Sequence, residues 1–143
     1  MALIPAAFEF RSDQFAIDPR EDEETNPGCY GRELGEWLRA NLAPDGEPLI
    51  AEDWGWCVML QRESFGLWVG CANVTGVRMG PPPSQPVAWS CIVGADVTIW
   101  TTYFWRRLAR RVSPDGALRD AADRLEALLR SNPRIRDLSR EAR

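Results

Sequence analysis

The chain has 143 residues, which fits one domain, and its 45% hydrophobic and 27% charged residues are typical of a globular protein. Its formal net charge is −4, it has no histidine, and all 17 of its cationic side chains are arginine. Without histidine and lysine the chain cannot use Ser-His-Asp or Cys-His catalysis, imidazole metal ligands, a lysine Schiff base or the lysine of a phosphate-binding loop. These absences favour a protein that is not an enzyme.

Charge is divided along the chain. Residues 1–105 carry 15 acids against 6 arginines, a balance of −9, whereas residues 106–143 carry 6 acids against 11 arginines, a balance of +5. Such asymmetry is typical of an acidic interaction face joined to a basic segment. The two ends could equally neutralise each other within the fold.

The N-terminus lacks the basic start of a signal peptide, and no uncharged apolar stretch reaches the roughly 20 residues that span a bilayer. We therefore expect a cytoplasmic protein that does not bind a membrane. Its four cysteines show no paired spacing, so we expect reduced thiols and neither a metal site nor a cofactor. They are Cys29, Cys57, Cys71 and Cys91.

The first third of the chain predicts a short strand, a loop and a helix. Phe8 and Phe10 share one parity, which is typical of a strand, and residues 18–26 form an acidic stretch that predicts a solvated loop. Asn26 can cap a helix that has Pro27 at its first position. Five apolar residues then fall on one helical face: Tyr30, Leu34, Trp37, Leu38 and Leu42.

The middle of the chain changes to a period of two. Residues 56–60 and 67–71 alternate around a polar turn at 61–64, which predicts a hairpin with apolar side chains on both faces. Residues 79–86 are too rich in proline to pair in a sheet and form a connecting loop. Residues 87–97 again alternate and predict a third strand.

The last third predicts helical structure. Residues 98–112 fit either a strand or an amphipathic helix, and both readings stay open. Ser113 and Pro114 predict the start of a clearer helix, and residues 134–143 read as a polar tail. Together the elements predict a single α+β domain over residues 1–143. Its antiparallel sheet has three to five strands, with an N-terminal helix and C-terminal helices packed on one face.

A resemblance accompanies this pattern. The pairing of YGRELGEWL with EDWGW, at residues 30–38 and 52–56, resembles a pattern found in small uncharacterised bacterial proteins of this length. It covers the predicted helix and the start of the hairpin. The resemblance implies this fold unit and a bacterial origin, and it implies no function.

Two carboxylates stand where the chain enters the predicted hairpin. Glu52 and Asp53 could act as an acid/base pair if one of them were desolvated against Trp54 or Trp56, which would raise its pKa. Adjacent strand residues point to opposite faces, however, and acids at the ends of elements commonly form turns. The turn is the stronger interpretation.

Seven tryptophans are more than one small core can bury. Trp37, Trp56 and Trp89 fall on predicted core faces, which leaves four others. Exposed tryptophan beside arginine is the composition of binding hot spots. The sequence therefore predicts a binding surface made of Glu52, Asp53, Trp54, Trp68, Trp100, Trp105, Arg106 and Arg107.

These features predict a non-enzymatic bacterial protein that binds another protein. An inhibitor or immunity-type protein for a basic partner fits its size and acidity, since opposite potentials speed association. The alternative is a carboxylate-dependent enzyme or small-ligand binder that uses Asp53 and Glu52 in a tryptophan-lined pocket. Homodimerisation through the arginine-rich residues 106–111 is a third hypothesis. Nucleic acid is disfavoured as a partner, because the sequence pI of about 4.9 opposes a phosphate backbone.

Overall fold

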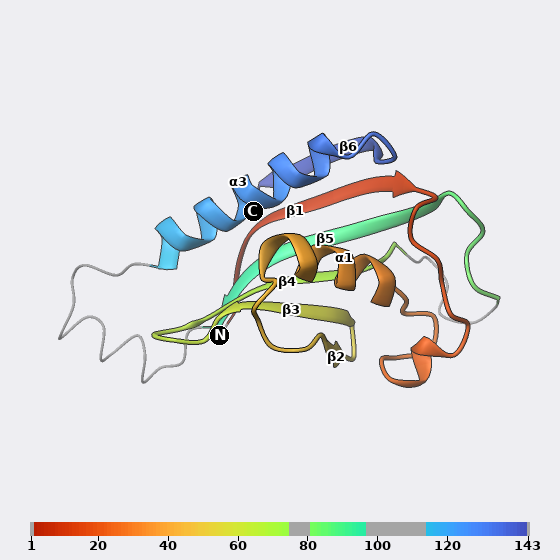
Figure 1. The fold of residues 1–143 in the computed structure, drawn as a ribbon, viewed down its shortest axis with the longest axis horizontal. Coiled ribbons are helices and arrows are strands. Elements are labelled where there is room, and N and C mark those ends of the chain that lie inside the picture. The colour runs from red at the N-terminus through yellow and green to blue at the C-terminus, as the bar shows by residue number, and fades with distance from the viewer. Residues whose placement is uncertain (1, 75–80, 97–113, 143) are drawn as a thin grey trace.

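In the computed structural model, which describes residues 2–74, 81–96 and 114–142, a six-stranded antiparallel sheet carries two α-helices (Figure 1). The strand order is β2-β3-β4-β5-β1-β6. The elements are β1 (Ala2–Ser12), the 3-10 helix η1 (Glu21–Glu23), α1 (Arg32–Leu42), β2 (Ile50–Glu52), β3 (Gly55–Gln61), β4 (Gly66–Asn73), β5 (Val87–Asp96), α3 (Pro114–Ser131) and β6 (Arg136–Ala142). Neither described α-helix is long and apolar enough to cross a membrane.

The predicted sheet of three to five strands with an N-terminal helix is wrong, because the sheet has six strands and the chain begins with β1. β1 is an interior strand that pairs with both β5 and β6. Phe8 and Phe10 face the core while Glu9 and Arg11 are exposed, which is the alternation of a strand with one covered face. The strand was predicted to be short because the apolar residues change from even positions at Phe8 and Phe10 to odd positions after them, and because Pro5 interrupts the segment before them.

β6 lies in the segment that the sequence predicts to be a polar tail. An edge strand needs only a few inward apolar groups, and exposed charges protect its free side from unwanted pairing. Leu138 packs against the core, and the guanidinium carbon of Arg140 lies 5.5 Å from the ring centroid of Phe8. The predicted polar tail is therefore wrong for residues 136–142, which form a polar edge strand paired with β1.

The predicted hairpin, third strand and last helix are confirmed as β3, β4, β5 and α3. Helices α1 and α3 pack on one face of the sheet, because alternate residues of the strands and the apolar stripes of both helices form one core. Trp56 and Trp89 belong to it, and Trp37 is half-buried against Phe15, with ring centroids 5.4 Å apart. The uncertain segment 98–112 lies outside the described residues.

The acidic loop at residues 18–26 is more structured than a solvated loop. Glu21 is only 2% exposed, and its Oε1 accepts the backbone N–H groups of Gly31 at 2.5 Å and Arg32 at 2.9 Å. These groups lie at the positive N-terminal end of α1, where a carboxylate is favoured. Gly31 has a φ of 142°, which favours glycine. Helix α1 thus begins at Arg32, several residues after the predicted cap at Asn26.

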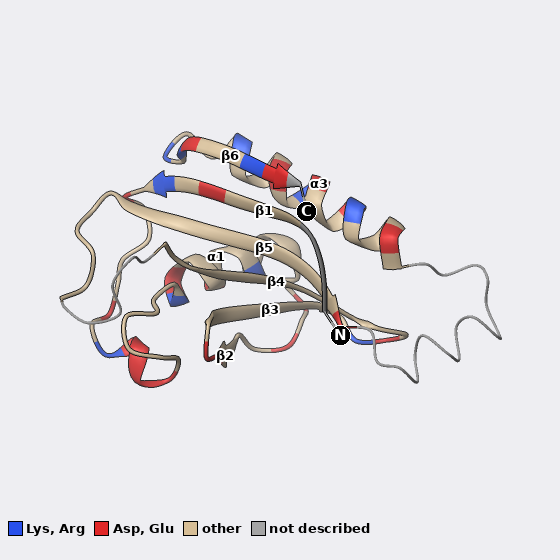
Figure 2. Cartoon of the chain, turned by 180° about the vertical axis from the view of Figure 1, so that it is seen from behind, with Lys and Arg blue, Asp and Glu red and all other residues tan. Residues whose placement is uncertain are grey.

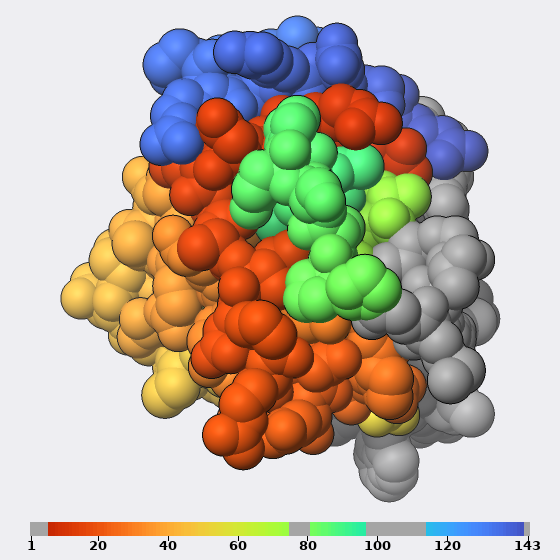
Figure 3. Space-filling model, turned by 90° about the vertical axis from the view of Figure 1, so that its right-hand side faces the viewer, coloured from red at the N-terminus to blue at the C-terminus, as the bar shows by residue number. Residues whose placement is uncertain are grey.

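Two side chains attach the segment before α1 and the segment after β1 to the rest of the fold. Asn73, at the end of β4, accepts the N–H of Tyr30 at 2.9 Å and donates to the carbonyl of Gly28 at 3.1 Å. Gln85 donates to the carbonyl of Phe15 at 2.9 Å, and Figure 3 shows residues 81–86 lying against the chain that follows β1. Both contacts fix the end of the sheet that lies farthest from the start of α3.

Replacing Glu21 with glutamine should destabilise the protein by about 2 kcal/mol. Both carboxylate oxygens now accept backbone N–H groups, Oε1 from Gly31 and Arg32 and Oε2 from Asp18, so the amide NH₂ of glutamine would face an N–H donor in either orientation. Urea unfolding of Glu21→Gln measures the change. The matched control is Glu23→Gln, whose side chain is 64% exposed in the same 3-10 helix and should leave the midpoint unchanged. Equal midpoints for the two variants would contradict this role of Glu21.

Candidate functional site

One face of the sheet carries no helix among the described residues. Figure 2 views the molecule from this side, with the strands in front of α1 and α3. The face is formed by the alternate strand residues that point away from the core, and its central strands are β3, β4 and β5. We call it the helix-free face. Its residues include Cys57, Trp68, Gly70, Ala72, Ser90, Ile92, Gly94, Glu9 and Arg11.

Trp54 lies at the edge of this face. It occupies the two-residue turn between β2 and β3, in which Glu52 pairs with Gly55. Its side chain is 41% exposed and stacks on Trp68, with ring centroids 5.5 Å apart and an angle of 32° between the rings. Trp54 therefore presents an indole to solvent in a position that a second indole supports.

Two glycines make room for these rings. A Cβ added to Gly70 would stand 2.5 Å from the ring of Trp54, and a Cβ added to Gly94 would collide with the ring of Trp68. Glycine within a strand often marks such a close approach. Gly70 and Gly94 therefore let the two indoles approach β4 and β5 closely.

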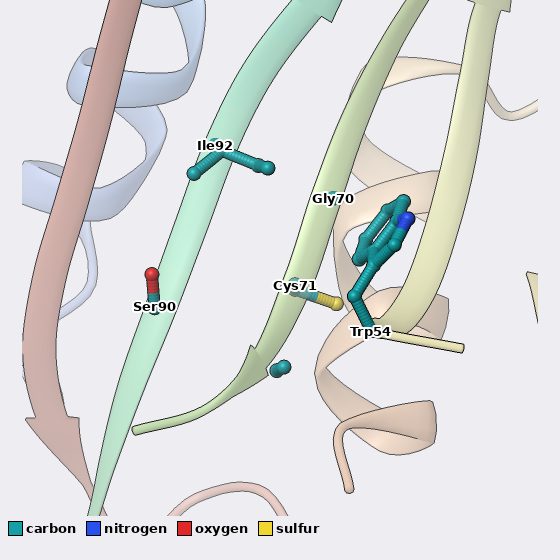
Figure 4. A pocket seen from close by; sticks show the side chains of 6 residues that line it. Trp54, Gly70, Cys71, Ser90 and Ile92 are labelled. Atoms are coloured by element: carbon teal, nitrogen blue, oxygen red, sulfur yellow. The ribbon is translucent and has the colours of Figure 1, made fainter. Parts of the chain in front are cut away.

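A shallow open depression of about 140 Å³ lies beside Trp54 (Figure 4). The indole of Trp54 extends from its turn toward Gly70 on β4, and Ser90 and Ile92 stand on the neighbouring strand β5. The lining is largely apolar, with the Ser90 hydroxyl among its few polar groups. The lining residues are Trp54, Gly70, Cys71, Ala72, Ser90 and Ile92.

Carboxylates flank the depression. Glu9 lies opposite Ser90 in the β1–β5 pairing, Glu52 lies on the last position of β2 opposite Gly55, and Asp96 ends β5, four residues beyond Ile92. These three residues and Asp53 are exposed and make no hydrogen bond or ion pair with the part of the chain that the structure describes. The surface around Trp54 is therefore apolar at its centre and acidic around it.

The structure brings together four of the eight predicted binding residues. Trp54 and Trp68 stack, and Glu52 and Asp53 precede Trp54 directly. Trp68 is only 7% exposed, so it supports Trp54 and presents little surface of its own. The other four, Trp100, Trp105, Arg106 and Arg107, lie outside the described residues.

Glu52 and Asp53 are not arranged as the acid/base pair of the alternative hypothesis. Both are exposed at the β2–β3 turn, and neither lines the depression beside Trp54. A general acid in this role requires desolvation to raise its pKa. Their arrangement matches the turn interpretation and gives no support to catalysis.

The sequence reasoning missed Glu9, Ser90 and Ile92 as parts of this surface. Glu9 alternates with Phe8 and Phe10, which does indicate a residue facing away from the core. Which outward residues of β1 and β5 become neighbours depends on strand order, and no local pattern carries that order. Gly70 and Gly94, each within a predicted strand, are local signals of a close approach on this face.

The buried thiols have environments that oppose nucleophilic chemistry. Burial raises the pKa of Cys57 to about 12, with further contributions from the nearby carboxylates Glu52 and Asp96. Burial also raises the pKa values of Cys71 and Cys91 well above the ordinary range. Reactive cysteines require the opposite shift. Within the described ranges, no group of three or more acids and cysteines could hold a metal ion.

Comparisons with known proteins returned no relatives. No protein-family model matches the sequence, and neither a curated protein nor a solved structure matches the chain. The bacterial group suggested by the YGRELGEWL and EDWGW segments therefore stays a prediction, and the candidate site depends on geometry alone.

Adding a methyl group at each of the two glycines should have different effects. Gly70→Ala should displace the exposed ring of Trp54 and change the near-UV circular dichroism while lowering stability by less than about 1 kcal/mol. Gly94→Ala pushes against the buried ring of Trp68 and should cost about 1–3 kcal/mol. Thermal melts and near-UV spectra of both variants test this. An unchanged spectrum for Gly70→Ala would show that Trp54 does not lie over Gly70.

The native thiols should react in a defined order with iodoacetamide at pH 8. Raising the pKa of Cys57 from 9.0 to about 12 lowers its thiolate fraction about a thousandfold at this pH, and the thiolate is the reactive species. Cys29, which is only partly buried, should be labelled while Cys57, Cys71 and Cys91 stay unlabelled until the chain unfolds. Peptide mass spectrometry before and after urea treatment measures the order. Labelling of Cys57 before unfolding would contradict the raised pKa of its buried thiol.

Proposed function

We propose that this chain is a non-enzymatic bacterial protein of the cytoplasm that binds a basic protein partner through its helix-free face. The observation that carries the proposal is the exposed indole of Trp54, held on Trp68 beside an apolar depression and flanked by carboxylates that have no ion pair within the described residues. Inhibition or immunity toward a basic toxin or enzyme is the specific form of this proposal.

The chemistry of the face supports a protein partner. Binding hot spots are enriched in tryptophan and lie in apolar centres that surrounding residues shield from water. Trp54 is already ordered by its stacking on Trp68, so binding would cost little side-chain entropy. An apolar centre with a polar rim is the usual anatomy of such interfaces.

The charge of the face supports a basic partner. Glu9, Glu52, Asp53 and Asp96 are left without ionic partners in the part of the chain that is described, whereas Glu47 is bound by Arg62 at 2.5 Å. Complementary potentials steer association and raise its rate. A second copy of the chain would bring like charges together, which disfavours the homodimer through this face.

The size of the depression argues against the small-ligand alternative. Sites for small molecules usually enclose about 300–1,000 Å³ and bury most of the ligand. The depression beside Trp54 offers about 140 Å³ and is open to solvent. It fits one side chain of a larger partner better than a whole metabolite.

Selection from a displayed library of short random peptides tests the proposal without a known partner. Peptides retained by the immobilised chain should be enriched in arginine and lysine, and salt should weaken them because the attraction is ionic. Trp54→Ser and the double variant Glu52→Gln/Asp53→Asn should each abolish this enrichment. The matched control is Asp120→Asn, which removes an exposed carboxylate from α3 on the other side of the sheet.

Three outcomes would overturn the proposal. They are a selected pool without basic enrichment, a pool enriched in acidic residues, and enrichment that survives both variants of the helix-free face. The control variant must keep the enrichment of the original chain, and thermal melts must show that all variants are folded.

A further inference from the structure

We infer that the depression beside Trp54 receives one arginine side chain of the basic partner, with its stem on the apolar lining and its guanidinium between Trp54 and Glu9. This inference deepens the proposed function and depends on it. Within the acidic helix-free face, the depression is then a site for one chemical group, the guanidinium.

The lining suits the stem of a long cationic side chain. Arginine and lysine commonly lay their methylene groups on apolar surface while the charged head stays in water. Gly70 and Ala72 on β4 leave the bottom of the depression free of long side chains, and Trp54 and Ile92 stand at its two sides. The opening to solvent leaves a path for the chain that carries the arginine.

The carboxylate of Glu9 suits the head group. Glu9 pairs with Ser90, which lines the depression, so their Cα atoms lie on adjacent strands about 5 Å apart. Glu9 is exposed, and it makes no hydrogen bond or ion pair in the described part of the chain. A guanidinium above Ser90 would meet this carboxylate, and the Ser90 hydroxyl offers a further acceptor.

Trp54 favours guanidinium over ammonium. A guanidinium is planar, weakly hydrated and able to stack on an indole face while it donates to a carboxylate in the same plane. The indole of Trp54 forms one side of the depression and is 41% exposed, so its surface is available to such a group. An ammonium would gain the charge attraction without the stacking.

The other charges of the face agree with this placement. Glu52 lies opposite Gly55 on the far side of Trp54 and adds negative potential from that direction. Arg11 is the arginine of β1, but it pairs with Ala88, two residues from Ser90 and outside the lining of the depression. A bound cation therefore sits closer to Glu9 than to Arg11. An apolar side chain in the same place would cover Glu9 without pairing it, which is unfavourable.

The test uses nuclear magnetic resonance of the ¹⁵N-labelled full chain. The indole N–H signal of Trp54 is assigned by its loss in Trp54→Phe, and the chain is titrated with N-acetyl-arginine methylamide. The citrulline analogue has nearly the same shape without the charge, and the norleucine analogue has only the apolar stem. The arginine probe should shift the Trp54 signal saturably and bind about fivefold more tightly than either analogue, in line with one cation–π contact.

Variants of the chain test whether the guanidinium of the arginine probe lies beside Glu9. Glu9→Gln should weaken the arginine probe about threefold, as expected for loss of one exposed ion pair, whereas Asp120→Asn on α3 should leave its affinity unchanged. The inference is overturned if the citrulline or norleucine analogue binds as well as the arginine probe. It is also overturned if the Trp54 signal does not respond, or if Glu9→Gln has no effect.

The two proposals fail in different ways. If basic peptides are selected through the helix-free face but the arginine probe leaves Trp54 unaffected, the arginine site is wrong and the basic partner stands. If no basic peptides are selected, the proposed function is wrong, and a saturable response of Trp54 to the arginine probe would then describe a site for arginine as a small ligand.

Discussion

The rings of Trp54 and Trp68 lie over strand positions that glycine occupies, and the character of the helix-free face depends on this packing. A sheet with apolar residues on both faces must cover both, and α1 and α3 cover only one of them. On the other face, Gly70 and Gly94 let the large rings approach the strands closely, so Trp68 is buried although no described helix lies above it. Trp54 completes this cover and stays exposed on its outer side.

The acids of the chain divide into those that hold the fold and those that do not. Glu21 is buried at the N-terminal end of α1, and Asp22 accepts the N–H of Gly28 at 3.0 Å. Near α3, Glu126 lies 3.4 Å from Arg140 of the edge strand β6. Glu9 and Glu52 on the helix-free face have no such function in the described fold. Carboxylates that contribute nothing to folding are available to a partner without loss of stability.

Local sequence patterns predicted the helices and strands in which apolar and polar residues alternate strongly. The remaining strands depend on long-range pairing, which local patterns do not show. The hairpin of β3 and β4 follows from its period of two, and the start of α3 at Pro114 follows from the helix-start signals of the sequence, so the sequence sufficed for them. β6 was not predicted, because charged residues such as Arg136 and Arg140 are typical of a polar tail. Only their pairing with β1 makes this segment a strand. The position of Glu9 beside Ser90, which lines the depression next to Trp54, was not predicted for the same reason, since it depends on strand order.

The arrangement separates the two quantities that would govern the proposed binding by this face. Exposed carboxylates such as Glu52 act over about one Debye length, so they set chiefly the association rate and its dependence on salt. A preordered aromatic such as Trp54 acts only in contact, so it sets chiefly the rate of dissociation. Trp54 is supported by Trp68, whose ring is already buried in the sheet. Contact with Trp54 therefore requires no rearrangement of the helix-free face. Charge and stacking can therefore vary independently on one sheet. In the proposed complex, the salt dependence of affinity would report the charge, and substitutions at Trp54 would report the stacking.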